Sequence, residues 1–131
     1  KVYSLFENGS EKIEKSKYYD EMGKLLPPII YVDAQTFSSD YDSNEVAADF
    51  KYRDKQIEIS GVIMGIKKGI TDDIYIELET SNMFLGVDCY LAKGQENNAV
   101  NYVKGQKIIL RGIGDKKILS PKLKECVIIL K

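Results

Sequence analysis

The chain has 131 residues, of which 44% are hydrophobic and 30% are charged, and its formal net charge at pH 7 is −1. Such a length and composition are typical of one soluble globular domain that buries a core without metal or disulfide staples. The chain contains no histidine, which excludes His-dependent catalytic triads and His-ligated zinc sites. None of its apolar runs approaches the roughly 20 residues that a membrane-spanning helix needs.

Charge is distributed unevenly along the chain. Residues 1–54 carry 7 Lys plus Arg and 11 Asp plus Glu, a net of −4, whereas residues 55–131 carry 12 and 9, a net of +3. The mildly basic second part permits a polyanionic partner but does not require one. The chain begins with Lys1 rather than methionine, as either a processed or a trimmed chain would, so its start leaves a removed leader open. We expect the cell envelope or export rather than the cytoplasm.

We divide the chain into an N-terminal extension, residues 1–32, and a domain that comprises residues 33–131. The extension is predicted to be partly helical, from Glu11 to about Leu26, because Pro27 would end a helix there. The apolar run from Ile29 to Val32 must rest on another surface, either the domain that follows or a neighbouring chain.

Two short helices are predicted at the start of the domain. Asp33 is a plausible cap for the first helix, in which Phe37 and Tyr41 lie four residues apart on one face. Ser43 or Asn44 can cap the second helix, EVAADFKY. The apolar stripe predicted for this second helix consists of Val46, Ala47 and Phe50.

The first and longest strand is predicted from Lys55 to Ile66. Its residues Ile57 and Ile59 alternate with polar residues, as in a strand with one face on a core. After Gly61 the apolar residues change parity, to Val62, Met64 and Ile66. We therefore predict a bulge or bend at Gly61, where no Cβ resists it.

Four further strands are predicted, with a short helix or turn between the third and fourth of the five. Their ranges are Ile74–Glu79, Phe84–Tyr90, Gln106–Ile113 and Leu123–Leu130, and the helical segment lies within Ala92–Lys104. The first two of these strands alternate and should form a hairpin. The residues predicted to face the core there are Ile74, Ile76, Leu78, Leu85, Val87 and Cys89.

The predicted order is three strands, a helical connection and two more strands, and the first strand is bent and contains glycine. This is the order of an OB-fold, a five-stranded Greek-key barrel. The chain also resembles the tRNA_anti-like (tRNA-anticodon-binding-like) OB family through NEVAADFKYRDKQIEISG, FLGVDCY, KGQKIILRG and LKEC, over about Val32 to Leu130. This resemblance implies a small bacterial protein, often with a signal or lipoprotein leader, and nucleic-acid binding by analogy. The predicted class is thus mainly β, a barrel with an α-helical N-terminal extension.

A ligand of such a barrel lies across the outer face of the second and third strands, between two flanking loops. The candidate nucleic-acid-binding residues on this basis are Tyr75, Tyr90, Phe84, Lys67, Lys68, Lys116, Lys117 and Lys122. The tyrosines would stack on bases and the lysines would bind phosphates. The same face is predicted to carry Glu77, Glu79 and Asp88, which would repel phosphates.

Other constellations give no catalytic residue, cofactor or metal site. The D-x-D-x-N sequence from Asp40 opens like a calcium loop but has Glu45 where glycine is needed and Lys51 where a glutamate belongs. Cys89 and Cys126 should both face the core, either as a disulfide or as buried thiols. We expect a non-enzymatic binding module for single-stranded nucleic acid. The alternative is a cell-envelope protein that binds a protein or peptide through the barrel or the Ile29–Val32 run.

Overall fold

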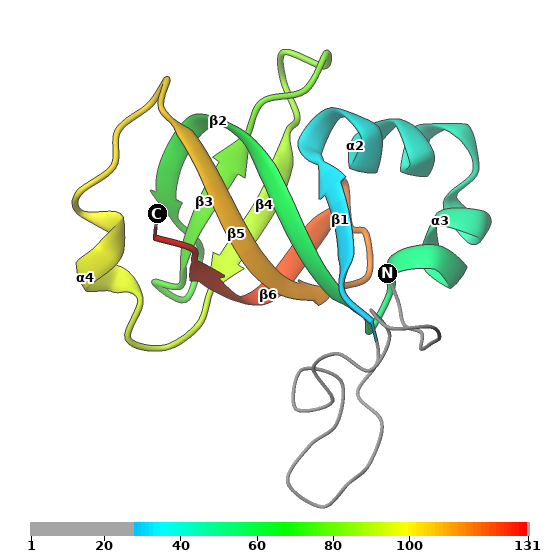
Figure 1. Ribbon diagram of the computed structural model, residues 1–131. Coiled ribbons are helices and arrows are strands. Elements are labelled where there is room, and N and C mark those ends of the chain that lie inside the picture. Colours follow the sequence, from blue (N-terminus) through cyan, green and yellow to red (C-terminus); the bar gives the residue numbers. More distant parts are fainter. Residues whose placement is uncertain (1–27, 131) are drawn as a thin grey trace, which may run out of the picture.

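Six strands curl into one closed sheet in the computed structural model, which describes residues 28–130 (Figure 1). The strands are β1 (Ile30–Asp33), β2 (Gln56–Lys68), β3 (Ile74–Leu78), β4 (Val87–Leu91), β5 (Lys107–Gly114) and β6 (Lys122–Ile128), and the helices are α2 (Ala34–Ser43), α3 (Glu45–Tyr52) and α4 (Glu96–Ala99). Helices α2 and α3 lie at one end of the barrel and α4 lies at the other (Figure 1).

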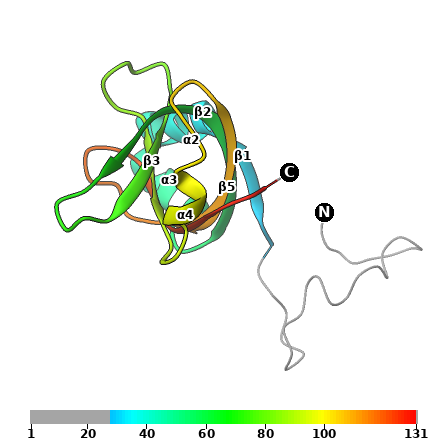
Figure 2. The same cartoon turned by 90° about the vertical axis from the view of Figure 1, so that its left-hand side faces the viewer.

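The strand order is β1-β2-β3-β4-β6-β5, and a further pairing of β2 with β5 closes the ring (Figure 2). Strands β4 and β6 run parallel, whereas β2–β3, β3–β4, β5–β6 and β2–β5 are antiparallel. Strands β2 to β6 with α4 between β4 and β5 therefore confirm the predicted OB-fold barrel.

The long strand β2 contributes to both halves of the barrel. Ile57, Ile59 and Ile63 are fully buried, so the inward parity continues past Gly61. The register with β3 shifts only between Ile63 and Gly65, and the prediction of a bend at Gly61 was wrong by about three residues. Gly61 instead permits close packing, since a Cβ there would lie 3.2 Å from the Ala34 Cβ. The predicted change of parity does occur, but after Ile63, since Ile66 packs against the core whereas Val62 and Met64 are only half-buried.

Strand β1 joins the barrel as a parallel neighbour of β2. Its residues from Ile30 to Asp33 pair with those from Ile57 to Ser60, and the side chains of Ile30 and Val32 pack against the core. The apolar run therefore rests on this chain's own barrel. The domain boundary that we placed after residue 32 falls inside β1, and the helix predicted from Glu11 to Leu26 lies outside the described residues.

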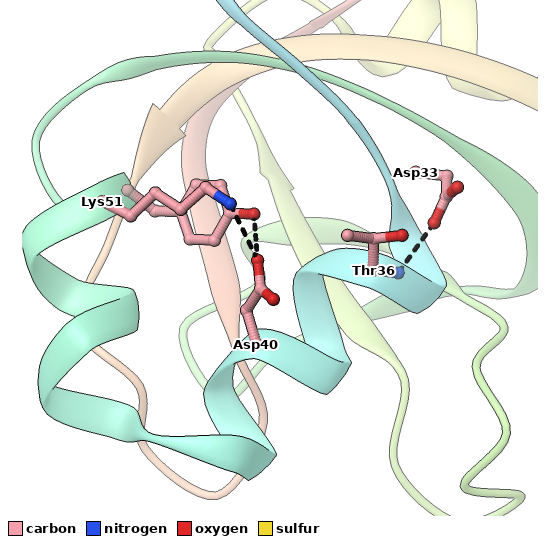
Figure 3. Close-up of polar contacts among 5 residues, drawn as sticks. Asp33, Thr36, Asp40 and Lys51 are labelled. Carbon is pink, nitrogen blue, oxygen red and sulfur yellow. Dashed lines mark hydrogen bonds and ion pairs between the residues drawn. The ribbon is translucent and has the colours of Figure 1, made fainter.

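Local capping signals define the helices α2 and α3. Asp33 Oδ1 accepts a hydrogen bond from the Thr36 backbone N–H at 2.7 Å (Figure 3), and Asn44 Oδ1 accepts one from the Ala47 N–H at 3.0 Å. These contacts confirm Asp33 as the first cap and identify Asn44 as the second. The predicted inward pair Phe37 and Tyr41 is buried as well.

The stripe predicted for α3 was wrong. Val46 and Phe50 are 68% and 79% exposed, and Ala48 and Tyr52 face the core instead. Tyr52 can be buried because its hydroxyl donates a hydrogen bond to Asp40 Oδ2 at 2.5 Å, which satisfies its polar group. Its ring packs on Phe37, with the ring centroids 4.7 Å apart.

Asp40 links the two helices. Its carboxylate accepts from Tyr52 and also from Lys51 Nζ at 3.2 Å, which reaches across from α3 (Figure 3). The Tyr52 hydrogen bond, followed by the hydrogen bond and charge of Lys51, lowers the pKa of Asp40 below its ordinary value despite partial burial. These contacts connect α2 to α3 and hold the aromatic cluster of Phe37, Tyr41 and Tyr52 together.

Candidate functional site

Tyr75 of β3 and Tyr90 of β4 lie side by side on the outer wall of the barrel. The two residues are directly paired across the strands, and their rings stack with centroids 4.8 Å apart and planes 26° apart. Their neighbours Ile76 and Cys89 are fully buried, and alternation along a strand therefore places the tyrosines outside. We use the term tyrosine face for Lys67, Tyr75, Glu77, Asp88, Tyr90 and Lys122, which strand register and side-chain contacts bring together here.

An ion pair lies on one side of this face. Lys67 Nζ of β2 is 2.7 Å from Glu77 Oε1 of β3, and the other Glu77 oxygen accepts a hydrogen bond from the Gly86 N–H at 3.3 Å. The hydrogen bond to Glu77 and its charge raise the pKa of Lys67. We predicted that Glu77 points outward, and it does, but it is buried beneath these contacts rather than solvated.

Asp88 lies directly opposite Glu77 in the β3–β4 pairing. Its Oδ1 atom is buried and accepts no hydrogen bond from any described residue. Burial, reinforced by the negative charge of Glu77, raises the pKa of Asp88 to about 6, and Lys122 and Lys67 oppose this shift. A buried carboxylate oxygen without a hydrogen-bond partner is unusual and is costly in the ionised form.

Lys122 of β6 adds a residue from a fourth strand to the tyrosine face, after those from β2, β3 and β4. It is the first residue of β6 and pairs with Asp88 across the parallel β4–β6 joint. Its Nζ lies 5.3 Å from the centre of the Tyr90 ring, a distance typical of cation–π contact. Tyr90 therefore contacts both Tyr75 and Lys122.

Phe84 belongs to the loop between β3 and β4, not to a strand. We predicted a strand from Phe84, but β4 begins at Val87, and Phe84 is 83% exposed while Leu85 is 37% exposed instead of facing the core. The Asn82 side chain explains the difference, because its Oδ1 accepts hydrogen bonds from the backbone N–H groups of Phe84 and Leu85 at 2.8 and 3.1 Å. This local turn competes with strand pairing.

Three loops project to the same side of the barrel as the tyrosine face (Figure 2). They connect β2 to β3, β3 to β4, and β5 to β6. Lys68 at the end of β2 and Lys116 in the β5–β6 loop are exposed, whereas Lys117 Nζ lies 3.7 Å from Glu45 Oε1 of α3. The structure thus gathers Tyr75, Tyr90, Lys67 and Lys122 and directs Lys117 toward a helix.

A metal site, a reactive thiol and a membrane-spanning helix each have structural requirements with which the described residues can be compared. No group of three or more His, Cys, Asp or Glu residues within residues 28–130 is arranged to hold a metal ion. Cys89 and Cys126 are free thiols and both are buried. A hydrogen bond with Cys126, followed by burial, raises the pKa of the Cys89 thiol, which disfavours a reactive thiolate. None of the helices within residues 28–130 has the length and apolar character that a membrane crossing requires.

The barrel topology defines an OB-fold protein. The model of the tRNA_anti-like family matches residues 2–127, and the chain belongs to this family. No curated protein matches it. A proposed nucleic acid-binding lipoprotein from Klebsiella pneumoniae subsp. pneumoniae MGH 78578 shares the fold, with a TM-score of 0.63, 14% identity, and 77% of this chain and 92% of that chain covered. A structure of yeast Stn1 and Ten1 aligns with a TM-score of only 0.45 and 16% identity, over 88% of this chain and 66% of that chain.

Proposed function

We propose that the protein is a non-enzymatic OB-fold module that binds single-stranded nucleic acid on the tyrosine face. The stacked pair of Tyr75 and Tyr90 carries the proposal, because aromatic side chains on an OB barrel wall stack on any base. The Klebsiella protein of the same fold has a name that proposes nucleic-acid binding, and this supports the same function here. That name also supports a cell-envelope location.

Lysines around the tyrosines supply the charge that a phosphate backbone requires. Lys67 and Lys122 belong to the face itself, and Lys68 and Lys116 are exposed in or beside the loops that flank it. Affinity should therefore depend on salt, since each phosphate contact releases counterions.

Fluorescence anisotropy with labelled single-stranded DNA and RNA, at low and moderate salt, tests the proposal. Replacement of Tyr75 or Tyr90 by alanine should weaken binding about 5- to 100-fold, because a base stack is worth about 1 to 3 kcal/mol. Tyr31→Ala is the matched control, since Tyr31 is 65% exposed on β1, on the other side of the barrel (Figure 2). Equal losses for Tyr31→Ala, or no binding at low salt, would contradict the proposed site.

The charge contribution has its own control. The exchanges Lys67→Glu, Lys68→Glu, Lys116→Glu and Lys117→Glu should each lower affinity and reduce the salt slope, by about 1 for each lost phosphate contact. The reduction should be smaller for Lys67 and Lys117, which already contact Glu77 and Glu45, than for the exposed Lys68 and Lys116. Lys104→Glu, an exposed site in the α4–β5 connection, should leave the slope unchanged. An affinity that does not vary with salt would show that phosphate contacts are absent.

The alternative function is that of an envelope protein that binds another protein. Ile30 and Val32 of the Ile29–Val32 run pack against the core of this chain, because β1 pairs with β2. The observation that favours the alternative is the exposure of Val46 and Phe50 on α3, since exposed apolar side chains on one helix are a common contact surface. Sedimentation equilibrium tests self-association, which Phe50→Ala should abolish; a monomer at all concentrations would contradict this form of the alternative.

A further inference from the structure

The tyrosine face carries its own negative charges between its lysines. Glu77 and Asp88 are paired across β3 and β4, in the row next to the one that pairs Tyr75 with Tyr90. Lys67 is held by Glu77 at 2.7 Å, and Lys122 is paired with Asp88 along the backbone and lies over the Tyr90 ring. Lys67 is therefore held by a carboxylate of the same protein, and two negative charges lie beside the tyrosines where a polyanion would bind.

The two carboxylates are not equivalent. Glu77 is held by a lysine and by a backbone N–H. Asp88 has a buried oxygen without a hydrogen-bond partner among the described residues, so the ionised form of Asp88 is the poorly compensated member of the pair. Of the two, Asp88 is the carboxylate that the surroundings favour in the protonated form.

We propose that the Glu77–Asp88 pair regulates the tyrosine face by repelling a polyanion with its negative charge, and that protonation of Asp88 weakens this repulsion. This inference rests on the proposed function and adds its regulation. The charged and titratable groups that act on Asp88 are Glu77 from β3, Lys122 from β6 and Lys67 from β2, and Tyr90 lies next to it on the same face of β4. Protonation removes one negative charge from the face and leaves both lysines cationic.

The geometry and the titration of Asp88 agree in direction. Burial and Glu77 raise the pKa of Asp88 to about 6, so the side chain is mostly ionised at pH 7.5 and mostly protonated at pH 5.5. If only the protonated form binds, the populations differ by up to about 25-fold between these two pH values. Affinity should therefore rise as the pH falls through about 6.

The test combines a titration with two binding measurements. The carboxyl ¹³C resonance of Asp88, assigned by its loss in Asp88→Asn, should titrate near pH 6 in the free protein. A rhodamine-labelled oligothymidylate, in which neither the dye nor the bases protonate in this range, should bind up to about 25-fold more tightly at pH 5.5 than at pH 7.5 at constant low salt. Inorganic polyphosphate, which cannot stack on tyrosine, should show the same pH dependence.

Three variants distinguish regulation by protonation of Asp88, which we call the Asp88 gate, from a general effect of surface charge. Asp88→Asn should bind equally well at both pH values, with the affinity of the wild type at pH 5.5. Glu79→Gln removes one exposed negative charge near the end of β3 and should keep the wild-type pH dependence. Lys122→Ala should bind weakly at both pH values and serves as a second variant if Asp88→Asn does not fold.

Each contrary outcome has a distinct meaning. Titration of Asp88 near pH 4, or polyphosphate binding that does not vary with pH, would overturn the gate. Oligothymidylate that fails to bind at either pH, while polyphosphate binding follows Asp88, would refute the nucleic-acid function and retain the gate. A pH dependence that persists in Asp88→Asn would assign it to another group and would overturn the proposal.

Discussion

Tyr52 combines packing and hydrogen bonding in one side chain, so its hydroxyl can be tested separately from its ring. The hydroxyl donates to Asp40 at 2.5 Å, and the ring is fully buried beside Phe37. Tyr52→Phe keeps the ring and removes the hydrogen bond. Because hydrogen bonds to charged groups contribute about 1.5 to 3 kcal/mol, the free energy of unfolding should fall by about 2 kcal/mol at pH 7 in urea titrations.

The pH dependence of this difference follows from the carboxyl group. The pKa of Asp40 is lowered in the folded protein, with the Tyr52 hydrogen bond as the main cause. The stability it provides is therefore present above the ordinary pKa of aspartate, about 4, and is lost as the pH falls through the lowered folded value. The cost of Tyr52→Phe should shrink in acid, whereas Tyr31→Phe, at an exposed tyrosine, should cost almost nothing at any pH. A cost independent of pH would indicate that the hydrogen bond to Asp40 is not its source.

Helix α3 shows at the scale of an element how periodicity can select the wrong face. The stripe of Val46, Ala47 and Phe50 is more apolar than the face that is actually buried, which consists of Ala48 and Tyr52. Periodicity reports which side chains share a face. Which face meets the core depends on the aromatic cluster of α2 and on the partner that Asp40 offers to Tyr52, and neither is visible in the helix's own sequence.

A pair of phenylalanine variants tests this orientation. Phe37→Ala in α2 should destabilise the protein by about 3 to 5 kcal/mol, because Phe37 is fully buried and its removal leaves a cavity. Phe50→Ala should change stability by no more than about 0.5 kcal/mol, since Phe50 is 79% exposed. Thermal or urea unfolding measures both. Similar losses in the two variants would show that α3 buries the face that the sequence pattern favours.

Features that depend on neighbouring residues were the easiest to predict from the sequence. The cap at Asp33, the cap at Asn44 (one of the two residues predicted for it) and the inward positions Ile76 and Leu78 of β3 depend on residues within a few positions of each other, and the structure confirms them. Ile74, which we predicted to face the core, is only half-buried. The start of β4 was misplaced because Asn82 captures the backbone of Phe84 and Leu85. That contact is also local, and an asparagine that precedes an apolar run was a usable signal for it.

Only part of the tyrosine face could be predicted from the sequence, because the rest depends on strand pairing between distant segments of the chain. Alternation placed Tyr75, Glu77, Asp88 and Tyr90 on one outer wall, and the β3–β4 hairpin aligned them. The contribution of Lys122 depends on the parallel β4–β6 pairing between segments far apart in the chain. Burial of Glu77 and of the Asp88 Oδ1 atom depends on the same closure, so a sequence pattern could name these carboxylates but not their environment.

Closure of the barrel can be measured through its two thiols. Cys89 on β4 and Cys126 on β6 are fully buried at the joint between these strands. A thiol reagent can reach them only when that joint opens, and opening of core strands costs nearly the full free energy of unfolding. Both thiols should therefore react with Ellman's reagent at least about a hundredfold more slowly in buffer than in urea.

The urea concentration at which each thiol becomes reactive shows whether the barrel opens in one step. If the ring opens as one unit, Cys89 and Cys126 should become reactive together, at the urea concentration where the circular dichroism signal is lost. Asn97→Cys, at an exposed position of α4, provides a thiol that should react at once in buffer and serves as the control for the reagent. Because both thiols lie at the joint between β4 and β6, their reaction at a lower urea concentration than the loss of the circular dichroism signal would mean that the β3–β4 hairpin detaches before the rest of the barrel unfolds. In that case Tyr75 and Tyr90 would separate from Lys122 of β6, and the tyrosine face would be lost before the barrel.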